Sequence, residues 1–402
     1  IESEFYPLVR KMERLIEYSN NTDQGYKKQV NLSIEEALRK LEEHQQIQEG
    51  IYGKSEETEG TYVILQTALR VLEGKNNYNE TSMMLYKLIP NAAIRTIDAY
   101  NDSVLAFGGD NGILYIVNVH NSSKLEIQID ERIRKIKFED PSNILVGTFE
   151  GNLYRVDLSK PFIKDSESNL WAANQPIVDI KVDLTVGELI IFSENQLIFM
   201  NLIDQSYNAR KVSFKIVGVE SLNNQLFIAS NKEIFLYNEQ SMVALPMESD
   251  LLENEQILTF SFSDQFLFIG TQSGKIFTFL HSFSADGNNP LEHLGTLVLH
   301  RSGITKLYFD EPTNTLYSSS FDNQILKYKI EKSNFDQVVR DFVSLIGHEK
   351  WVWDMSLTRD AEGKELIVTI DENGNVLTWY KNQMDLATKV KNLLKKQKQT
   401  LE

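Results

Sequence analysis

The chain has 402 residues, of which 42% are hydrophobic and 24% charged, with a formal net charge of −16, a pI near 5.0 and no cysteine. The absence of cysteine excludes disulfides, thiol nucleophiles and cysteine-ligated metals, and it predicts a cytoplasmic location. The acidic charge repels phosphate backbones, and no apolar run is long enough to span a bilayer. We therefore expect neither a nucleic-acid nor a membrane partner.

Residues 1–82 carry apolar side chains at helical spacing. Within 5–16 they recur every three or four positions, which is one face of a helix. A second helix is predicted to begin at Ser33, which can act as its N-cap, and Glu36 completes a capping box. A third helix is expected over 62–72. The sequence therefore predicts an N-terminal helical arm ahead of the rest of the chain.

From residue 83 the hydrophobic period changes from helical to two. Seven apolar opening strands begin near residues 93, 132, 176, 215, 256, 303 and 352. Each is followed by two more strands joined by a polar turn such as DNG, EGN or QSG, where Asn or Gly supplies the positive φ of a hairpin. This repeat length predicts an all-β, seven-bladed propeller over residues 83–381, with four strands in each blade.

The outer, fourth strands are less regular than the other three. The stretch SESNLWAANQ before the third blade fits a strand poorly. No outer strand follows the seventh blade, because 382–402 has the pattern of an amphipathic helix with Leu386 and Leu393 on one face. The segment 83–88, MMLYKL, precedes the first blade. We predict that it supplies the missing strand and closes the ring, since an open blade would expose a strand edge.

The seventh blade carries a histidine before its first strand, a threonine on the second, an aspartate in the turn and a tryptophan on the third. These residues are His348, Thr369, Asp371 and Trp379. With this set the stretch 83–381 resembles the WD-repeat β-propeller family. The resemblance implies that the four side chains form one structural hydrogen-bond network, which satisfies the buried imidazole and indole. Blade six carries a related set, His300, Ser320 and Asp322, with Tyr328 in the tryptophan position.

Motifs for catalysis or cofactor binding are absent from the sequence. There is no GxxxxGK[ST] phosphate loop, no HExxH and no GxSxG, and no two of the six histidines have metal-ligand spacing. A structural role also explains His348 and Asp371 better than a catalytic one. We expect no enzyme activity, no cofactor and no metal, and a propeller that binds protein; an enzyme with its site in the central channel is the least favoured alternative.

The order of predicted elements adds a second resemblance. A helical arm that leads into a propeller, with a helix after the last blade, is similar to the C-terminal part of bacterial STAND-type signal-transducing NTPases. That resemblance implies a ligand-sensing or autoinhibitory module of a signalling or defence protein whose NTPase and effector lie upstream. The alternative is a stand-alone scaffold that assembles other proteins. The ligand, the binding face and the oligomeric state stay open.

Overall fold

The computed structural model describes residues 79–380 with gaps at 82, 89–91, 101–102, 122, 160–168, 173–174, 184–186, 223–224, 239–240, 248–250, 283–290, 331–341, 360–362 and 364. Of the predicted arm over 1–82, only 79–81 are described; they follow the last predicted helix and form a short strand. The rest of the arm and the predicted helix over 382–402 lie outside the described residues.

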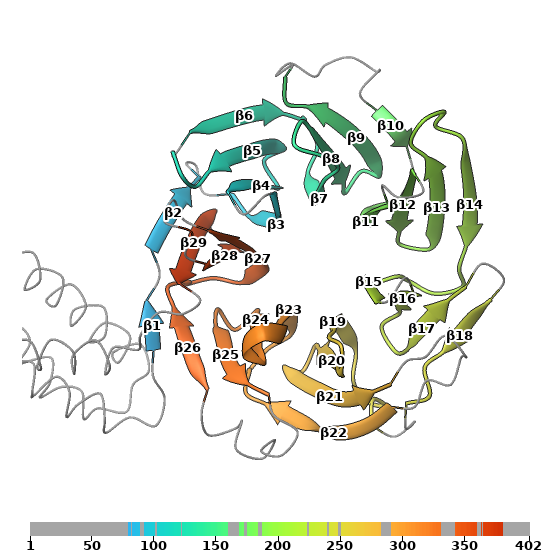
Figure 1. Cartoon of the computed structure of the whole chain (residues 1–402), viewed down its shortest axis with the longest axis vertical. Coiled ribbons are helices and arrows are strands. Elements are labelled where there is room, and N and C mark those ends of the chain that lie inside the picture. The colour runs from blue at the N-terminus through green and yellow to red at the C-terminus, as the bar shows by residue number, and fades with distance from the viewer. Residues whose placement is uncertain are drawn as a thin grey trace, which may run out of the picture. The chain divides into compact units, whose positions relative to one another are not determined.

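Seven small sheets follow one another around a ring (Figure 1). Their first strands lie innermost and are β3 (Ile94–Tyr100), β7 (Ile133–Phe138), β11 (Ile177–Asp183), β15 (Gly218–Leu222), β19 (Ile257–Phe262), β23 (Ile304–Asp310) and β27 (Val352–Arg359). The second strands are β4 (Val104–Gly109), β8 (Asn143–Thr148), β12 (Glu188–Ser193), β16 (Gln225–Ala229), β20 (Phe266–Thr271), β24 (Thr315–Ser320) and β28 (Glu365–Asp371). The third strands are β5 (Ile113–Asn118), β9 (Asn152–Asp157), β13 (Gln196–Asn201), β17 (Ile234–Tyr237), β21 (Lys275–His281), β25 (Ile325–Lys329) and β29 (Asn375–Tyr380). The prediction of an all-β, seven-bladed propeller is thus confirmed.

Outer strands complete blades one to five. They are β6 (Lys124–Gln128), β10 (Asn169–Ala172), β14 (Tyr207–Lys211), β18 (Met242–Ala244) and β22 (Leu291–Val298). A single 3-10 turn, η2 (Glu311–Thr313), joins β23 to β24. The poorly patterned stretch before the third blade does hold a strand, β10, which pairs with β9. Its register shifts between Asn169 and Trp171, and this irregularity breaks the period of two that the sequence would otherwise show.

The seventh blade receives its outer strand from the start of the ring. Strand β2 (Met83–Lys87) pairs antiparallel with β29, and Met84 lies opposite Leu377. In Figure 1 the blue β2 lies beside the red β29 for this reason. The chain segment that precedes blade one therefore belongs to blade seven, so that the first and last parts of the ring share one sheet.

Two compact units divide the chain. The ring unit comprises 82–339 and 347–381, and the other unit comprises 1–81, 340–346 and 382–402. The described part of the second unit contains β1 (Asn79–Thr81) and β26 (Val343–Ile346), which pair in parallel with Glu80 opposite Leu345.

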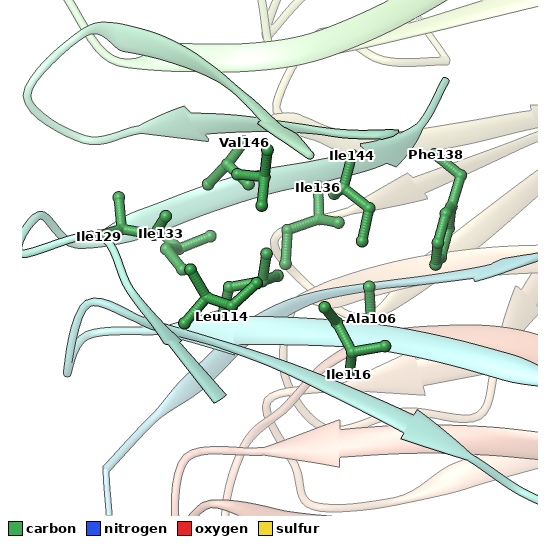
Figure 2. Close-up of a cluster of buried hydrophobic side chains, with 11 residues drawn as sticks. Ala106, Leu114, Ile116, Ile129, Ile133, Ile136, Phe138, Ile144 and Val146 are labelled. Carbon is green, nitrogen blue, oxygen red and sulfur yellow. The ribbon is translucent and has the colours of Figure 1, made fainter. Parts of the chain in front are cut away.

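The hydrophobic core lies between neighbouring blades. Figure 2 shows one cluster in which Ala106, Leu114 and Ile116 of blade one face Ile136, Ile144 and Val146 of blade two. Equivalent clusters lie between blades seven and one, two and three, three and four, and four and five. Because each sheet buries both faces against its neighbours, the blades are held by apolar packing, and their turns remain at the surface.

Glycines on the second strands allow the blades to approach closely. A Cβ atom added at Gly147 would lie 2.6 Å from the side chain of Ile177, and one at Gly270 would lie 2.7 Å from Ile304. In each case the isoleucine begins the first strand of the next blade. A larger residue would therefore push two blades apart.

Candidate functional site

The predicted set of blade seven lies together at the turn between β28 and β29. The Nδ1 atom of His348 is 2.7 Å from the Asp371 carboxylate, and its Nε2 atom is 2.6 Å from the Thr369 hydroxyl. Nδ1–H donates to the carboxylate, and the Thr369 hydroxyl can either donate to Nε2 or accept from it. Trp379 packs its ring 5.5 Å from the His348 ring, but its Nε1 has no hydrogen-bond partner among the described residues. Three of the four predicted residues are therefore joined by hydrogen bonds, Asn375 also donates to Asp371 at 2.8 Å, and the tryptophan contributes packing.

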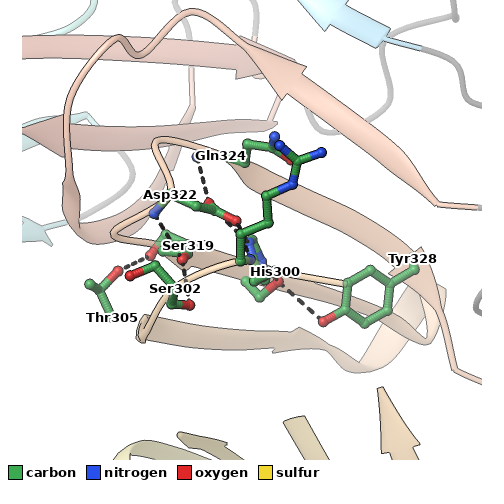
Figure 3. A network of polar contacts seen from close by, with 10 residues as sticks. His300, Ser302, Thr305, Ser319, Asp322, Gln324 and Tyr328 are labelled. Carbon is green, nitrogen blue, oxygen red and sulfur yellow. Dashed lines mark hydrogen bonds and ion pairs between the residues drawn. The ribbon is translucent and has the colours of Figure 1, made fainter. Parts of the chain in front are cut away.

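Blade six forms a related network with a different serine from the one predicted (Figure 3). His300 Nδ1 contacts the Asp322 carboxylate at 3.0 Å, and its Nε2 lies 2.7 Å from Ser318 Oγ. Tyr328 donates to the same Ser318 hydroxyl at 3.1 Å. Ser320 instead donates to the backbone carbonyl of Ser302 and accepts from the amide of Asp322.

Strand register explains this correction. Ser318 lies opposite Leu326 as Thr369 lies opposite Leu377, so Ser318 is the counterpart of Thr369. Ser320 then holds the position of Asp371, and both side chains accept an amide N–H from the turn two residues later. The carboxylate that binds His300 comes from Asp322, deeper in the turn. The prediction rested on the order of residue types alone, and it therefore chose Ser320, the serine nearest to Asp322.

We expect the Asp371 carboxylate to make stability depend on pH. Burial opposes its ionisation, but the hydrogen bond and charge of His348, together with Asn375, lower the pKa of Asp371 below its usual value. The stabilisation is therefore complete above about pH 4, the pKa range of an unfolded Asp, and is lost as pH falls through the lowered pKa. Chemical denaturation at a series of pH values should show this loss in the wild type and a flatter profile in Asp371→Asn. Identical profiles would exclude the linkage.

A central channel of about 320 Å³ runs between the first strands of all seven blades. One residue from each strand forms its middle layer: Thr96, Lys135, Asp179, Gly218, Thr259, Lys306 and Asp354. In six of the blades this residue follows a register shift at the start of the first strand. The shift re-aims the strand, so charged side chains reach the channel between buried apolar neighbours.

Ion pairs join successive blades along one side of the channel. Asp98 pairs with Lys137 at 3.1 Å, and Lys135 pairs with Asp179 at 3.1 Å. A looser pair of 3.8 Å joins Lys181 to Glu220 in the next blade. The channel wall formed by blades one to four is therefore ionic and internally paired.

The pair of Lys135 and Asp179 is held by mutual electrostatics. Burial disfavours the charge of Lys135, but the carboxylates of Asp179, Asp354 and Asp98 raise its pKa. Burial likewise opposes ionisation of Asp179, and Lys135 and Lys181 lower its pKa. Both groups therefore stay charged at neutral pH.

Aromatic side chains gather at one mouth of the channel. Trp351 is 49% exposed, and its ring lies 5.3 Å from Phe321 and 6.1 Å from Trp353, in edge-to-face geometry. Phe321 and Trp353 are 5.0 Å apart. We call these three residues the aromatic cluster. Phe321 lies in the turn between β24 and β25, Trp351 directly precedes β27, and Trp353 lies on β27.

A charged clamp holds the base of the aromatic cluster. The Arg95 guanidinium lies 4.1 Å from the centre of the Trp353 ring, binds both carboxylate oxygens of Asp110 and reaches Glu372 at 3.1 Å. The Trp353 indole N–H donates to Glu372 at 2.5 Å. Trp353 is thereby fixed in orientation, whereas Trp351 presents its ring to solvent.

Neither the channel charges nor the aromatic cluster was predicted as a site. The alternation of charged and apolar residues in RIRKIKF and IVDIKVD was a local signal for charges that face a common axis. The cluster had only a weak signal, the two tryptophans in KWVWD, because its third member, Phe321, comes from the neighbouring blade six.

Solved structures share this architecture. The WD40 β-propeller domain of Doa1 aligns with 75% of this chain and 98% of its own length, at a TM-score of 0.59 and 13% identity. A chain of a mitotic checkpoint complex aligns with 76% of this chain and 93% of its own length, at a TM-score of 0.58 and 15% identity. The predicted WD-repeat propeller fold is thus confirmed. No family model matches the chain, and no curated protein matches it in sequence.

Two kinds of feature are absent from the residues that the structure describes. No group of three or more His, Cys, Asp or Glu side chains in that part of the chain is placed to hold a metal ion. Within the same residues, no helix has the length and apolar character needed to cross a bilayer.

Proposed function

We propose that this propeller is a protein-recognition module whose partner docks on the aromatic cluster of Phe321, Trp351 and Trp353. The observation that carries the proposal is the exposed Trp351 ring on a rigid base. Tryptophan is enriched among residues that dominate binding energy, and a pre-organised surface loses less conformational entropy on binding. The fold supports this use, because one of the similar structures is a chain of the mitotic checkpoint complex.

The charges around the cluster indicate the chemistry of the partner. Arg95 is already paired with Asp110 and Glu372, and the Trp353 N–H is also satisfied. The surface that remains for a partner to contact is therefore formed by the aromatic rings. We propose a protein segment with an apolar or aromatic anchor residue. The net charge of −16 supports a protein partner over a nucleic acid.

Site-specific crosslinking tests this surface. A photoreactive amino acid at position 351 should capture a partner that the same probe at Tyr207, an exposed aromatic on β14, does not capture. The captured protein is then purified and titrated against variants of the chain. Trp351→Ala should weaken its affinity by about thirtyfold, as for a hot-spot residue, and Tyr207→Ala should leave it unchanged. Equal affinities for the two variants would refute docking on the cluster.

The sensor and scaffold hypotheses place this recognition in different settings. As a sensor, the propeller belongs to a STAND-type switch in a signalling or defence system, and its ligand must bind the active state better than the resting state. As a scaffold, it joins partners without a switch. A cytoplasmic location, supported by the absence of cysteine, suits both. A P-loop NTPase module upstream in the complete gene product would favour the sensor.

We assign a structural role to the histidine networks of blades six and seven. His348 is 3% exposed, and Thr369 and Asp371 are fully buried, so a substrate has no access to them. Closed networks of this kind satisfy buried polar groups and set the spacing between a strand pair and the loop before it. This burial supports the structural role over a catalytic one.

A further inference from the structure

The middle layer of the channel contains the same charge arrangement twice. Lys135 in blade two is followed by Asp179 in blade three, and Lys306 in blade six is followed by Asp354 in blade seven. All four residues occupy the same register position, directly after the shift at the start of the first strand. The two lysine–aspartate couples are therefore matched in fold position and can be compared directly.

The first couple is closed. Lys135 Nζ lies 3.1 Å from the Asp179 carboxylate, which also accepts a hydrogen bond from the backbone amide of Ile180 at 2.8 Å. Asp354 also acts on Lys135, and Lys306 on Asp179, through longer-range charge interactions, but neither makes an ion pair with this couple among the described residues. A ligand that entered between Lys135 and Asp179 would have to break an ion pair within the protein, which opposes binding at this side of the channel.

The second couple is open. No ion pair and no hydrogen bond joins the Lys306 ammonium to another of the residues that the structure describes. The Asp354 carboxylate accepts backbone amide hydrogens from Met355 at 2.9 Å and Ile97 at 3.4 Å, but it makes no ion pair within the described part of the chain. A carboxylate has about four acceptor sites, so Asp354 retains capacity for a cationic donor.

The channel leaves room beside the open couple. The two blades before Lys306 contribute only Thr259 and Gly218 to the middle layer. The channel as a whole, lined by all seven blades, has a volume of about 320 Å³, which lies at the lower end of the range of small-ligand pockets. One wall thus combines an ammonium group that has no ion-pair partner among the described residues, a carboxylate with spare acceptor sites, and small side chains.

We propose that the open couple binds a small zwitterion of the α-amino acid type. The ligand carboxylate pairs with Lys306, its ammonium group donates to Asp354, and its side chain occupies the space beside Thr259 and Gly218. A zwitterion replaces the missing ion pair with two charge-assisted hydrogen bonds, whereas a simple anion or cation would satisfy only one partner. This site does not depend on the docking of a protein at the channel mouth.

Isothermal titration calorimetry of the 402-residue chain with each common L-α-amino acid tests the proposal. At least one should bind. Its N-acetylated and carboxamide derivatives, which lack one of the two charges, should bind about tenfold more weakly or not at all. Absence of binding by every amino acid to the folded protein would overturn the proposal, as would binding that ignores both modifications.

Variants in the channel locate the site. Lys306→Met and Asp354→Asn should each lower the affinity by about tenfold or more. Lys181→Met is the matched control, because it removes a half-buried lysine of the same channel that already has Glu220 as a partner. This control should keep wild-type affinity. Lys306→Gln provides a second test if the methionine variant fails to melt cooperatively. Unchanged affinity in the Lys306 variants would place any binding elsewhere and refute the site.

Discussion

Replacing Trp379 with alanine lowers the free energy of unfolding by about 3–5 kcal/mol, the usual loss for a buried aromatic residue. Trp379 is 1% exposed, and it packs against the His348 ring at the point where blade seven meets its loop. Its removal leaves a cavity beside a buried imidazole and a buried carboxylate. The surrounding side chains cannot fill this cavity without breaking the hydrogen-bond network. Chemical denaturation followed by far-ultraviolet circular dichroism measures the loss.

Trp351→Ala is the matched control for this measurement. It removes the same side chain from the same blade region, but Trp351 is half exposed, so the loss should be below about 1 kcal/mol. An equally small loss for Trp379→Ala would show that the indole contributes little to the blade. A loss of partner binding by Trp379→Ala without any loss of stability would favour a functional role for this residue.

Deleting residues 1–90 causes the chain to aggregate, because it removes the closing strand β2. The edge of β29 would then lose its antiparallel neighbour and expose its backbone hydrogen-bonding groups. The deletion also removes Tyr86, whose ring packs against Phe107 and Tyr115 of blade one. Blade seven would thus lose both a strand and part of its contact with blade one. Size-exclusion chromatography and thermal melting report the outcome.

A chain that begins at Asn79 is the control for the deletion. It keeps β2 and its pairing with β29, so it should remain soluble and melt cooperatively. Aggregation of both truncated chains would assign the effect to residues before β2. A soluble and cooperative chain without residues 1–90 would refute closure of the ring by this strand.

The local sequence pattern was sufficient to predict the positions of the blades. The seven first strands begin at positions 94, 133, 177, 218, 257, 304 and 352, and the sequence placed six of these within one residue. Alternating apolar residues and Asn- or Gly-containing turns specify a hairpin without reference to the rest of the chain. The exception is β15, which begins three residues later than predicted because 215–217 leads into the strand without joining its ladder.

Contacts between segments that are distant in the sequence were harder to predict from the sequence. The choice between Ser318 and Ser320 depends on cross-strand register and on how far the Asp322 side chain reaches back from the turn. A sequence that contains two serines two positions apart on the same face of a strand does not distinguish them. The spacing of residue types could therefore identify the network of blade six, but it could not show which of the two serines belongs to it.

The sequence by itself determined the fold class of this protein, the number of blades and the histidine-centred sets, because hairpins and turns arise from residues close together in the chain. Only the tertiary structure decided which charges meet. Arg95 and Glu372 pair across the junction of the first and last blades. Lys135 pairs with Asp179, whereas Lys306 makes no such ion pair with any residue that the structure describes. Closing the ring brings seven separate first strands to one axis, and the distances between their side chains follow from that closure rather than from any local pattern.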